Sequence, residues 1–577
     1  MLYPQLNEFR STTSLDGLWD FRFEWPGDDA AGWENGFSAT KRVPVPASFN
    51  DLFTTYSERN HWGPVWYSHE VRIPELWRGQ RIVLRVGAAS YSADVWVNGQ
   101  HLGSHETGHT PFEFEIGMHL REGVNLIVVR VNTRLTPDTV PTGELFMPGT
   151  SIHMGNNKPP GNFDFFPYGG IQRPVVLYTT PRTFLGSVFV DTAVGDASAE
   201  VAFRIGCQGD ADALRITIEE SGESVETQLS GASAQCVIEV AHPCLWSPDD
   251  QHLYHARVEL LRGGQVVDVY RQRFGIRTVE VSGGKFLLNG RPFYFKGFGR
   301  HEDFPVSGRG HNPAANVRDF ELLRWIGANS FRTSHYPYSE EQLDMADEQG
   351  ILVISESPAV GIVPDLATEK TLAVHCAVQR EYMLRDYNHP SVVMWSVANE
   401  PLSSQPSARA YFERVVRVAR ETDSSRPVTM VTCHTLQDVC LDLFDVVCVN
   451  AYPGWYGGGD PFSSSVAGFA DYLAKVHEYS GGRPVLVTEF GADSIAGFHM
   501  LPSELWTEDY QEELIGRLIA EIRKCPHAIG EHVWAMCDFR TGQSDRRALG
   551  NRKGVFTRER QPKAVAHTLR RLWKGAE

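Results

Sequence analysis

The 577-residue sequence lacks the features that mark membrane-spanning, exported and nucleic-acid-binding proteins. No run of about 18 apolar residues occurs, and the start, MLYPQLNEFRS, has no basic segment followed by an apolar one. Neither a membrane span nor a signal peptide is therefore expected. Dense Lys/Arg tracts are also missing: 54 Lys+Arg against 71 Asp+Glu give a net charge of −17, which argues against nucleic acid or an anionic membrane as a partner.

The spacing of the cysteines shows no sign of disulfide pairs or metal ligands. The nine cysteines are scattered, odd in number and without a C-x-x-C pair, which excludes a disulfide framework and a zinc site of ordinary spacing. We therefore expect a protein of a reducing compartment, the cytoplasm, that binds no metal.

The first part of the chain is rich in short strands. At roughly 150 residues per domain, the length predicts three or four domains. Segments such as RIVLRVG and NLIVVRVNTR alternate apolar and polar residues, and the Asn98-Gly99 step predicts a tight hairpin turn. Residues 1–180 are predicted to form a β sandwich, and 181–277 a second one of immunoglobulin-like size.

From residue 278 onward, apolar runs alternate with amphipathic segments. Helical periodicity separates eight runs, among them ILVISES, VVMWSVANE and VLVTEFG. This alternation over about 300 residues predicts a (β/α)8 barrel for residues 278–577. Cys433, Cys440 and Cys448, in or near these runs, are interpreted as small core residues.

Two carboxylates end nearly unbroken apolar runs of this predicted barrel. Glu400 follows the fourth run and Glu489 ends the seventh, so both belong at the carboxyl end of the barrel, where active sites of this fold lie. A single Glu after a strand is more often a solvated strand end or an ion-pair partner. A pair across one barrel mouth suits glycoside hydrolysis, which needs one protonated and one ionised carboxyl group.

The segments VANEP and VTEFG resemble glycoside hydrolases of family 2, and within them the β-glucuronidases. The resemblance covers essentially the whole chain. It implies a sugar-binding-like, jelly-roll-like sandwich, an immunoglobulin-like sandwich and a catalytic barrel, in that order. It further implies Glu400 as acid/base, Glu489 as nucleophile, Asn399 as the ligand of the sugar 2-hydroxyl and a retaining mechanism, for which the two carboxyl groups lie roughly 5–5.5 Å apart.

The segment RRALGNRKGVFTRERQPKA resembles the part of β-glucuronidases that binds the C6 carboxylate of the sugar. Asn551 and Lys553 would supply charge-assisted hydrogen bonds to that carboxylate; the alternative is a solvated basic loop. We expect a loop lysine here to contribute little to stability. Other positions match the pattern, with implied roles in contacting sugar hydroxyls, in orienting the nucleophile (Tyr452) and in contacting the carboxylate (Arg547): Asp164, Tyr168, His335, Asn450, Tyr452, Tyr456, Trp534 and Arg547.

The sequence therefore predicts a three-domain retaining β-glucuronidase without metal or organic cofactor. Its substrates would be small-molecule or oligosaccharide β-glucuronides, and the resemblance implies a homo-oligomer, a dimer or a tetramer. Other family 2 activities, β-galactosidase, β-mannosidase or β-galacturonidase, stay open, as does a non-catalytic carbohydrate-binding protein. His301, Glu302 and Asp303 could in principle hold a metal, but hydrogen bonding is the favoured role.

Overall fold

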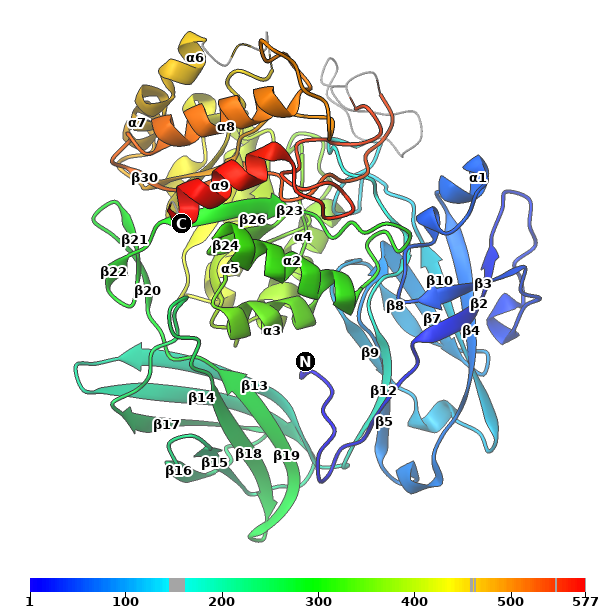
Figure 1. Cartoon of the computed structure of the whole chain (residues 1–577). Helices are drawn as coiled ribbons and strands as arrows, with labels where there is room; N and C mark the ends of the chain where they lie inside the picture. Colours follow the sequence, from blue (N-terminus) through cyan, green and yellow to red (C-terminus); the bar gives the residue numbers. More distant parts are fainter. Residues whose placement is uncertain (145–160, 457–459, 461–462, 545–546, 576–577) are drawn as a thin grey trace.

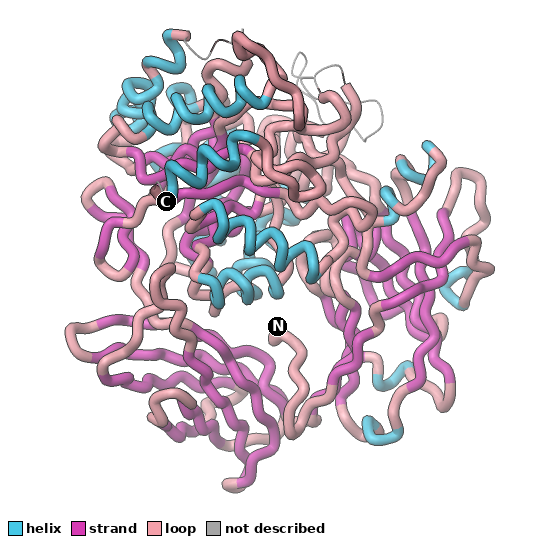
Figure 2. Tube along the Cα trace, in the orientation of Figure 1, coloured by secondary structure: helices cyan, strands magenta, loops and turns pink. Residues whose placement is uncertain are grey.

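The computed structural model describes the whole chain except residues 145–160, 457–459, 461–462, 545–546 and 576–577. Two β sandwiches lie on different sides of an α/β body, and Figure 2 shows that helices are concentrated in that body. Within the described residues, no helix is long and apolar enough to cross a membrane.

The first sandwich consists mainly of two antiparallel sheets around one apolar core. The four-stranded sheet has the order β1 (Thr12–Ser14), β12 (Val175–Thr180), β5 (Arg81–Val86), β9 (Phe112–Glu115). The six-stranded sheet has the order β3 (Lys41–Val45), β2 (Gly17–Phe23), β4 (Pro64–Arg72), β10 (Val124–Asn132), β7 (Ser92–Val97), β8 (Gln100–His105). The predicted hairpin turn between β7 and β8 is confirmed, since Asn98 and Gly99 have φ values of 51° and 80°.

The second sandwich has its own core and two smaller sheets. One has the order β13 (Phe184–Val194), β14 (Ser198–Gln208), β17 (Ser233–Ala241). The other has the order β16 (Ser224–Gln228), β15 (Ala213–Ile218), β18 (Tyr254–Arg262), β19 (Gln265–Phe274). The expected immunoglobulin-like sandwich is thus present; the domain limits 1–180, 181–277 and 278–577 stay a proposal.

Eight parallel strands close into the predicted barrel. They are β23 (Phe295–Arg300), β24 (Ser330–Thr333), β25 (Leu352–Glu356), β26 (Val392–Asn399), β27 (Val428–Thr432), β28 (Val446–Asn450), β29 (Val485–Glu489) and β30 (Ala528–Trp534). Only β30 differs clearly from its apolar run: it begins four residues before His532 and ends at Trp534. Glu531 interrupts the apolar pattern there, and its carboxylate is buried against Arg523 and Trp573.

Amphipathic helices between the strands cover the barrel. The longer ones are α2 (Pro313–Ile326), α3 (Glu340–Gln349), α4 (Glu369–Arg385), α5 (Pro406–Thr422), α7 (Phe469–Tyr479), α8 (Glu508–Ile522) and α9 (Ala564–Lys574). Local sequence sets their ends: the Asn312 side chain caps the start of α2, and Gly327, at φ 85°, ends it.

The amino end of the barrel is closed by a small antiparallel sheet. β20 (Val279–Ser282), β21 (Lys285–Leu288) and β22 (Arg291–Pro292) precede the first barrel strand. Phe286 and Leu288 of β21 join Trp246 and the interior residues Leu352 and Leu486 in one buried apolar cluster. Apolar side chains therefore fill the amino end of the barrel.

The first sandwich contributes chain to that carboxyl end. Phe163 and Phe165 pack into the main apolar cluster of the barrel, and the Phe166 amide donates to the carbonyl of Arg540, in the segment after β30, at 2.9 Å. Arg558 from the same region donates to Asp51 of the sandwich at 2.7 Å. These contacts fix residues 161–166 beside the strand ends.

Candidate active site

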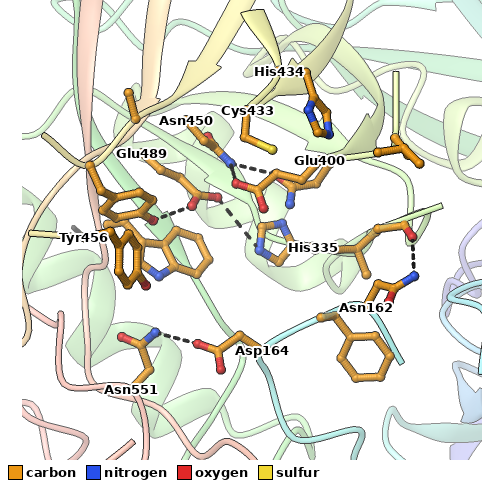
Figure 3. A pocket seen from close by; sticks show the side chains of 18 of the residues that line it. Asn162, Asp164, His335, Glu400, Cys433, His434, Asn450, Tyr456, Glu489 and Asn551 are labelled. Atoms are coloured by element: carbon orange, nitrogen blue, oxygen red, sulfur yellow. Dashed lines mark hydrogen bonds and ion pairs between the residues drawn. The ribbon is translucent and has the colours of Figure 1, made fainter. Parts of the chain in front are cut away.

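One cavity of about 660 Å³ lies at the carboxyl end of the barrel strands. Figure 3 shows side chains from several strand ends converging on it. Of the residues predicted for the site, all but Tyr168 and Lys553 line it: Asp164, His335, Asn399, Glu400, Asn450, Tyr452, Tyr456, Glu489, Trp534, Arg547 and Asn551.

A fully buried guanidinium, that of Arg332, is paired with a carboxylate that lines the cavity, that of Glu489. Arg332, next to last in β24, donates to Glu356 at 2.7 Å and to Glu489 at 2.5 Å. Burial alone would raise the pKa of Glu356, but the charge of Arg332 and a hydrogen bond with His335 hold it below its ordinary value. Glu356 is the last residue of β25 and Arg332 the next to last of β24, and a position at the carboxyl end of an apolar strand is a signal that could have added both to the predicted site.

Both carboxylate oxygens of Glu489 are occupied by donors from different elements. Oε1 accepts from Arg332, and Oε2 accepts from the hydroxyl of Tyr452 at 2.6 Å. The ring of His335 stacks on Trp534 at a centroid distance of 5.0 Å, and its Nε2 lies 3.9 Å from Oε1. The carboxylate is therefore fixed in orientation at the cavity wall.

Glu400 has a different environment. It follows a register shift between β26 and β27 and has a φ of 45°, in the left-handed region that residues other than glycine adopt infrequently. Its Oε1 accepts from the Asn450 amide at 2.8 Å. Burial, followed by the charge of Glu489, raises the pKa of Glu400 to about 7. A carboxyl group with a raised pKa thus shares one cavity with a carboxylate whose orientation is fixed.

The far end of the cavity is lined by one cation, Arg547, and one amide, Asn551. Arg547 donates to Asp164 at 2.8 Å and to the Tyr456 hydroxyl at 3.1 Å, and Asn551 donates to the same Asp164 oxygen at 2.9 Å. Figure 3 shows Asp164 and Asn551 at the opposite end from Glu400 and His434. An anionic or hydroxyl-bearing ligand group fits these donors.

Lys553 is buried, which excludes the alternative of a solvated basic loop at this residue and argues against the expectation that it contributes little to stability. Only 1% of the residue is exposed, and its ammonium is paired with the fully buried Asp493 and donates to Tyr456 at 3.1 Å. The basic run suggested a solvated loop because its acidic partner is 60 residues away in the chain.

Tyr168 and one of the three cysteines interpreted as core residues differ from their predicted locations. Tyr168 is buried outside the cavity, where its hydroxyl contacts Asp51 and Asp303. Cys440 and Cys448 are buried as predicted, but Cys433 is exposed and lines the cavity, so its interpretation as a core residue is wrong.

The His301–Asp303 stretch makes hydrogen bonds in separate directions. His301 contacts the Tyr336 hydroxyl, Glu302 accepts from Gln342 and Asp303 accepts from Arg558. In the described part of the chain, metal-like spacing occurs at a different place, in Asp344, Asp347 and His389, where Arg273 already pairs with both aspartates.

Comparisons with known proteins agree with this architecture. Family models described as glycosyl hydrolases family 2 match the chain: the sugar binding domain over residues 12–181, a further family 2 domain over 183–277 and the TIM barrel domain over 279–577. The chain belongs to glycosyl hydrolase family 2, and the resemblance drawn from its residues is confirmed.

Within this family, the chain is similar over nearly its whole length to proteins named β-glucuronidase. The β-glucuronidase of Paenibacillus borealis is 42% identical, covering 99% of this chain and 98% of its own, and that of Homo sapiens is 39% identical, covering 100% and 93%. The structure of a β-D-glucuronidase from Dictyoglomus thermophilum is 41% identical with a TM-score of 0.91, over 100% of this chain and 99% of that one. A Bifidobacterium dentium β-glucuronidase complexed with coumarin-3-O-glucuronide is 39% identical with a TM-score of 0.93, over 100% and 99%.

The buried pairing of Lys553 leads to a stability prediction. Lys553→Ala leaves the Asp493 carboxylate in the interior without its nearest cation, and breaking a buried pair costs about 3–5 kcal/mol. The free energy of unfolding, measured by urea denaturation, should fall by that amount. Lys524→Ala is the control, since Lys524 pairs with Glu521 at an exposed position and its loss costs about 0–1 kcal/mol. Equal effects of the two substitutions would contradict the buried pairing.

Proposed function

We propose that this protein is a retaining β-glucuronidase, which hydrolyses terminal β-D-glucuronides to glucuronic acid and an aglycone. The observation that carries the proposal is the cavity itself, with two carboxyl groups in contrasting environments at one end and the donors Arg547 and Asn551, backed by Lys553, at the other. The names of the full-length relatives support it.

In this proposal Glu489 is the nucleophile. Its carboxylate attacks the anomeric carbon while Arg332 and Tyr452 hold its two oxygens. Glu400, protonated because of its raised pKa, gives its proton to the leaving oxygen, so the glycosidic bond breaks as the ester to Glu489 forms. Glu400 then takes a proton from water, which attacks the anomeric carbon and releases glucuronic acid with retained configuration.

The remaining residues would bind the sugar. Arg547, Asn551 and Lys553 would receive the C6 carboxylate together with the Tyr456 hydroxyl. Asn399 would contact the 2-hydroxyl, and the other proposed contacts with hydroxyls or the ring are made by Asp164, His335, Asn450 and Trp534. None of these steps calls for a metal or organic cofactor. A cytoplasmic location and a homo-oligomeric state remain part of the proposal.

A panel of 4-nitrophenyl glycosides that differ only in the sugar tests the function. The β-glucuronide should give the highest kcat/KM because a hydrogen bond to a charged group contributes about 1.5–3 kcal/mol, roughly 10- to 150-fold, over a sugar without C6 carboxylate. A β-galacturonide, which differs only at C4, is the demanding competitor. A faster galacturonide would reassign the substrate, a faster neutral sugar would refute carboxylate recognition, and no turnover of any sugar would favour a binding protein.

The pKa of Glu400 predicts the pH profile. The proton donor must be protonated when substrate arrives, and Glu400 is protonated below its pKa of about 7. The value of kcat/KM should therefore fall about tenfold per pH unit above pH 7 on a substrate with a poor leaving group. Glu400→Gln, assayed on an activated leaving group that needs no protonation, should lose this basic limb. If kcat/KM of the variant still fell above pH 7 as in the wild type, the titrating group would be a residue other than Glu400.

The two carboxylates should respond differently to removal. Glu489→Ala should lose nearly all turnover and regain some with azide, which enters the vacated space and gives the α-glucuronosyl azide. Glu400→Ala should lose about 10²- to 10⁴-fold on poor leaving groups but keep partial activity on good ones. Circular dichroism would check folding of both variants. The same behaviour of both on every leaving group would contradict the assignment.

A further inference from the structure

Asp493 connects the strand of the proposed nucleophile, β29, with residues 547–553. We call these residues the donor loop, because they include the proposed hydrogen-bond donors to the C6 carboxylate of the substrate. Asp493 lies four residues after Glu489, and its side chain is fully buried. Neither the paired strand-end glutamates nor the family pattern pointed to it, and it does not line the cavity.

The Asp493 carboxylate contacts the donor loop at three points. Its Oδ1 accepts from the backbone amide of Arg552 at 2.7 Å. Its Oδ2 accepts from the Lys553 ammonium and lies 3.5 Å from Nη1 of Arg547. One side chain thus holds both cations and the backbone between them.

We infer that Asp493 is a positioning residue for uronate recognition: it fixes the ammonium of Lys553, and through it the Tyr456 hydroxyl, at the end of the cavity that carries Arg547 and Asn551. The inference rests on the proposed β-glucuronidase function.

The chemistry of lysine explains why such an anchor is needed. Its ammonium is strongly hydrated and sits on a flexible four-carbon stem, so burial without a counter-charge is costly. Apart from Asp493, Lys553 contacts the Tyr456 hydroxyl and the faces of Tyr452, Trp455 and Tyr456 at 5.0–5.6 Å. The aromatic faces surround the ammonium without setting its direction, whereas the carboxylate does.

If Asp493 acted only through its charge, its removal would strengthen the binding of a uronate, whereas a positioning role predicts that binding weakens. Two cations, Arg547 and Lys553, face two carboxylates, Asp164 and Asp493, at this end of the site. Asp493→Asn makes the cluster more positive by one unit, so a purely coulombic site would bind a uronate more tightly. A positioning role predicts weaker binding, and the sign of the change separates the two.

The experiment is a double-mutant cycle on 4-nitrophenyl β-glucuronide with wild type, Asp493→Asn, Lys553→Met and the double variant. Asp493→Asn should raise KM at least about tenfold with kcat changed less than about threefold, the scale of one charge-assisted hydrogen bond. In the Lys553→Met background, the same substitution should change kcat/KM by less than about twofold. An asparagine can still accept from the Arg552 amide, and Arg547 keeps its hydrogen bond with Asp164, so the contact with the Lys553 ammonium is the one that the substitution weakens. Turnover by wild type tests the proposed function separately.

Asp268→Asn is the matched control, since Asp268 is an equally buried aspartate paired with Arg10 far from the cavity; it should leave KM and kcat unchanged. A lower KM in Asp493→Asn, or equal losses in both backgrounds, would overturn the inference. If Asp493→Asn does not fold, the double variant, which leaves neither member of the pair charged, is compared with Lys553→Met, and a further loss of kcat/KM there would overturn it as well.

Discussion

The ion pairs of Arg332 are the interaction on which the rest of the site depends. Its guanidinium is fully buried inside the barrel between Glu356 and Glu489. Moving any one of these charges from water into the interior costs several kcal/mol, and the cost is offset only because the three lie within hydrogen-bond distance. Both oxygens of Glu489 can thus be fixed, one by the guanidinium and one by the Tyr452 hydroxyl.

Glu400 differs from Glu489 chiefly because it has no direct hydrogen bond from a cation among the described contacts. Arg332 donates to Glu489 directly, whereas the hydrogen bond that holds Glu400 comes from the neutral amide of Asn450. Two carboxyl groups at one cavity can divide the tasks of acid and nucleophile when their surroundings separate their pKa values. Burial and the neighbouring negative charge of Glu489 raise the pKa of Glu400 to about 7, so this group is protonated at pH values below neutral.

The barrel and much of the cavity could be predicted from sequence because both follow local rules. Parallel strands buried on two faces give unbroken apolar runs, and the polar residue that ends each run points to the carboxyl end. β30 begins earlier than the apolar run that predicted it, because it includes Glu531. This buried carboxylate is paired with Arg523 at the end of a helix, and apolar periodicity does not reveal such a partner. The pairing of Lys553 with Asp493 has the same cause: a basic loop gives no sign of which distant carboxylate buries it. Cys433 was misplaced because a residue just past a strand can face either the core or the cavity.

Trapping the covalent intermediate tests the central claim, attack by Glu489, most directly. A 2-deoxy-2-fluoro-β-glucuronosyl fluoride slows the second step more than the first, so the glycosyl-enzyme accumulates and can be digested for mass spectrometry. The account predicts one added 2-fluoroglucuronosyl group, on the peptide that contains Glu489 and on that residue. A label on Glu400 or Glu356, or release of fluoride at a steady rate with no labelled peptide, would contradict it.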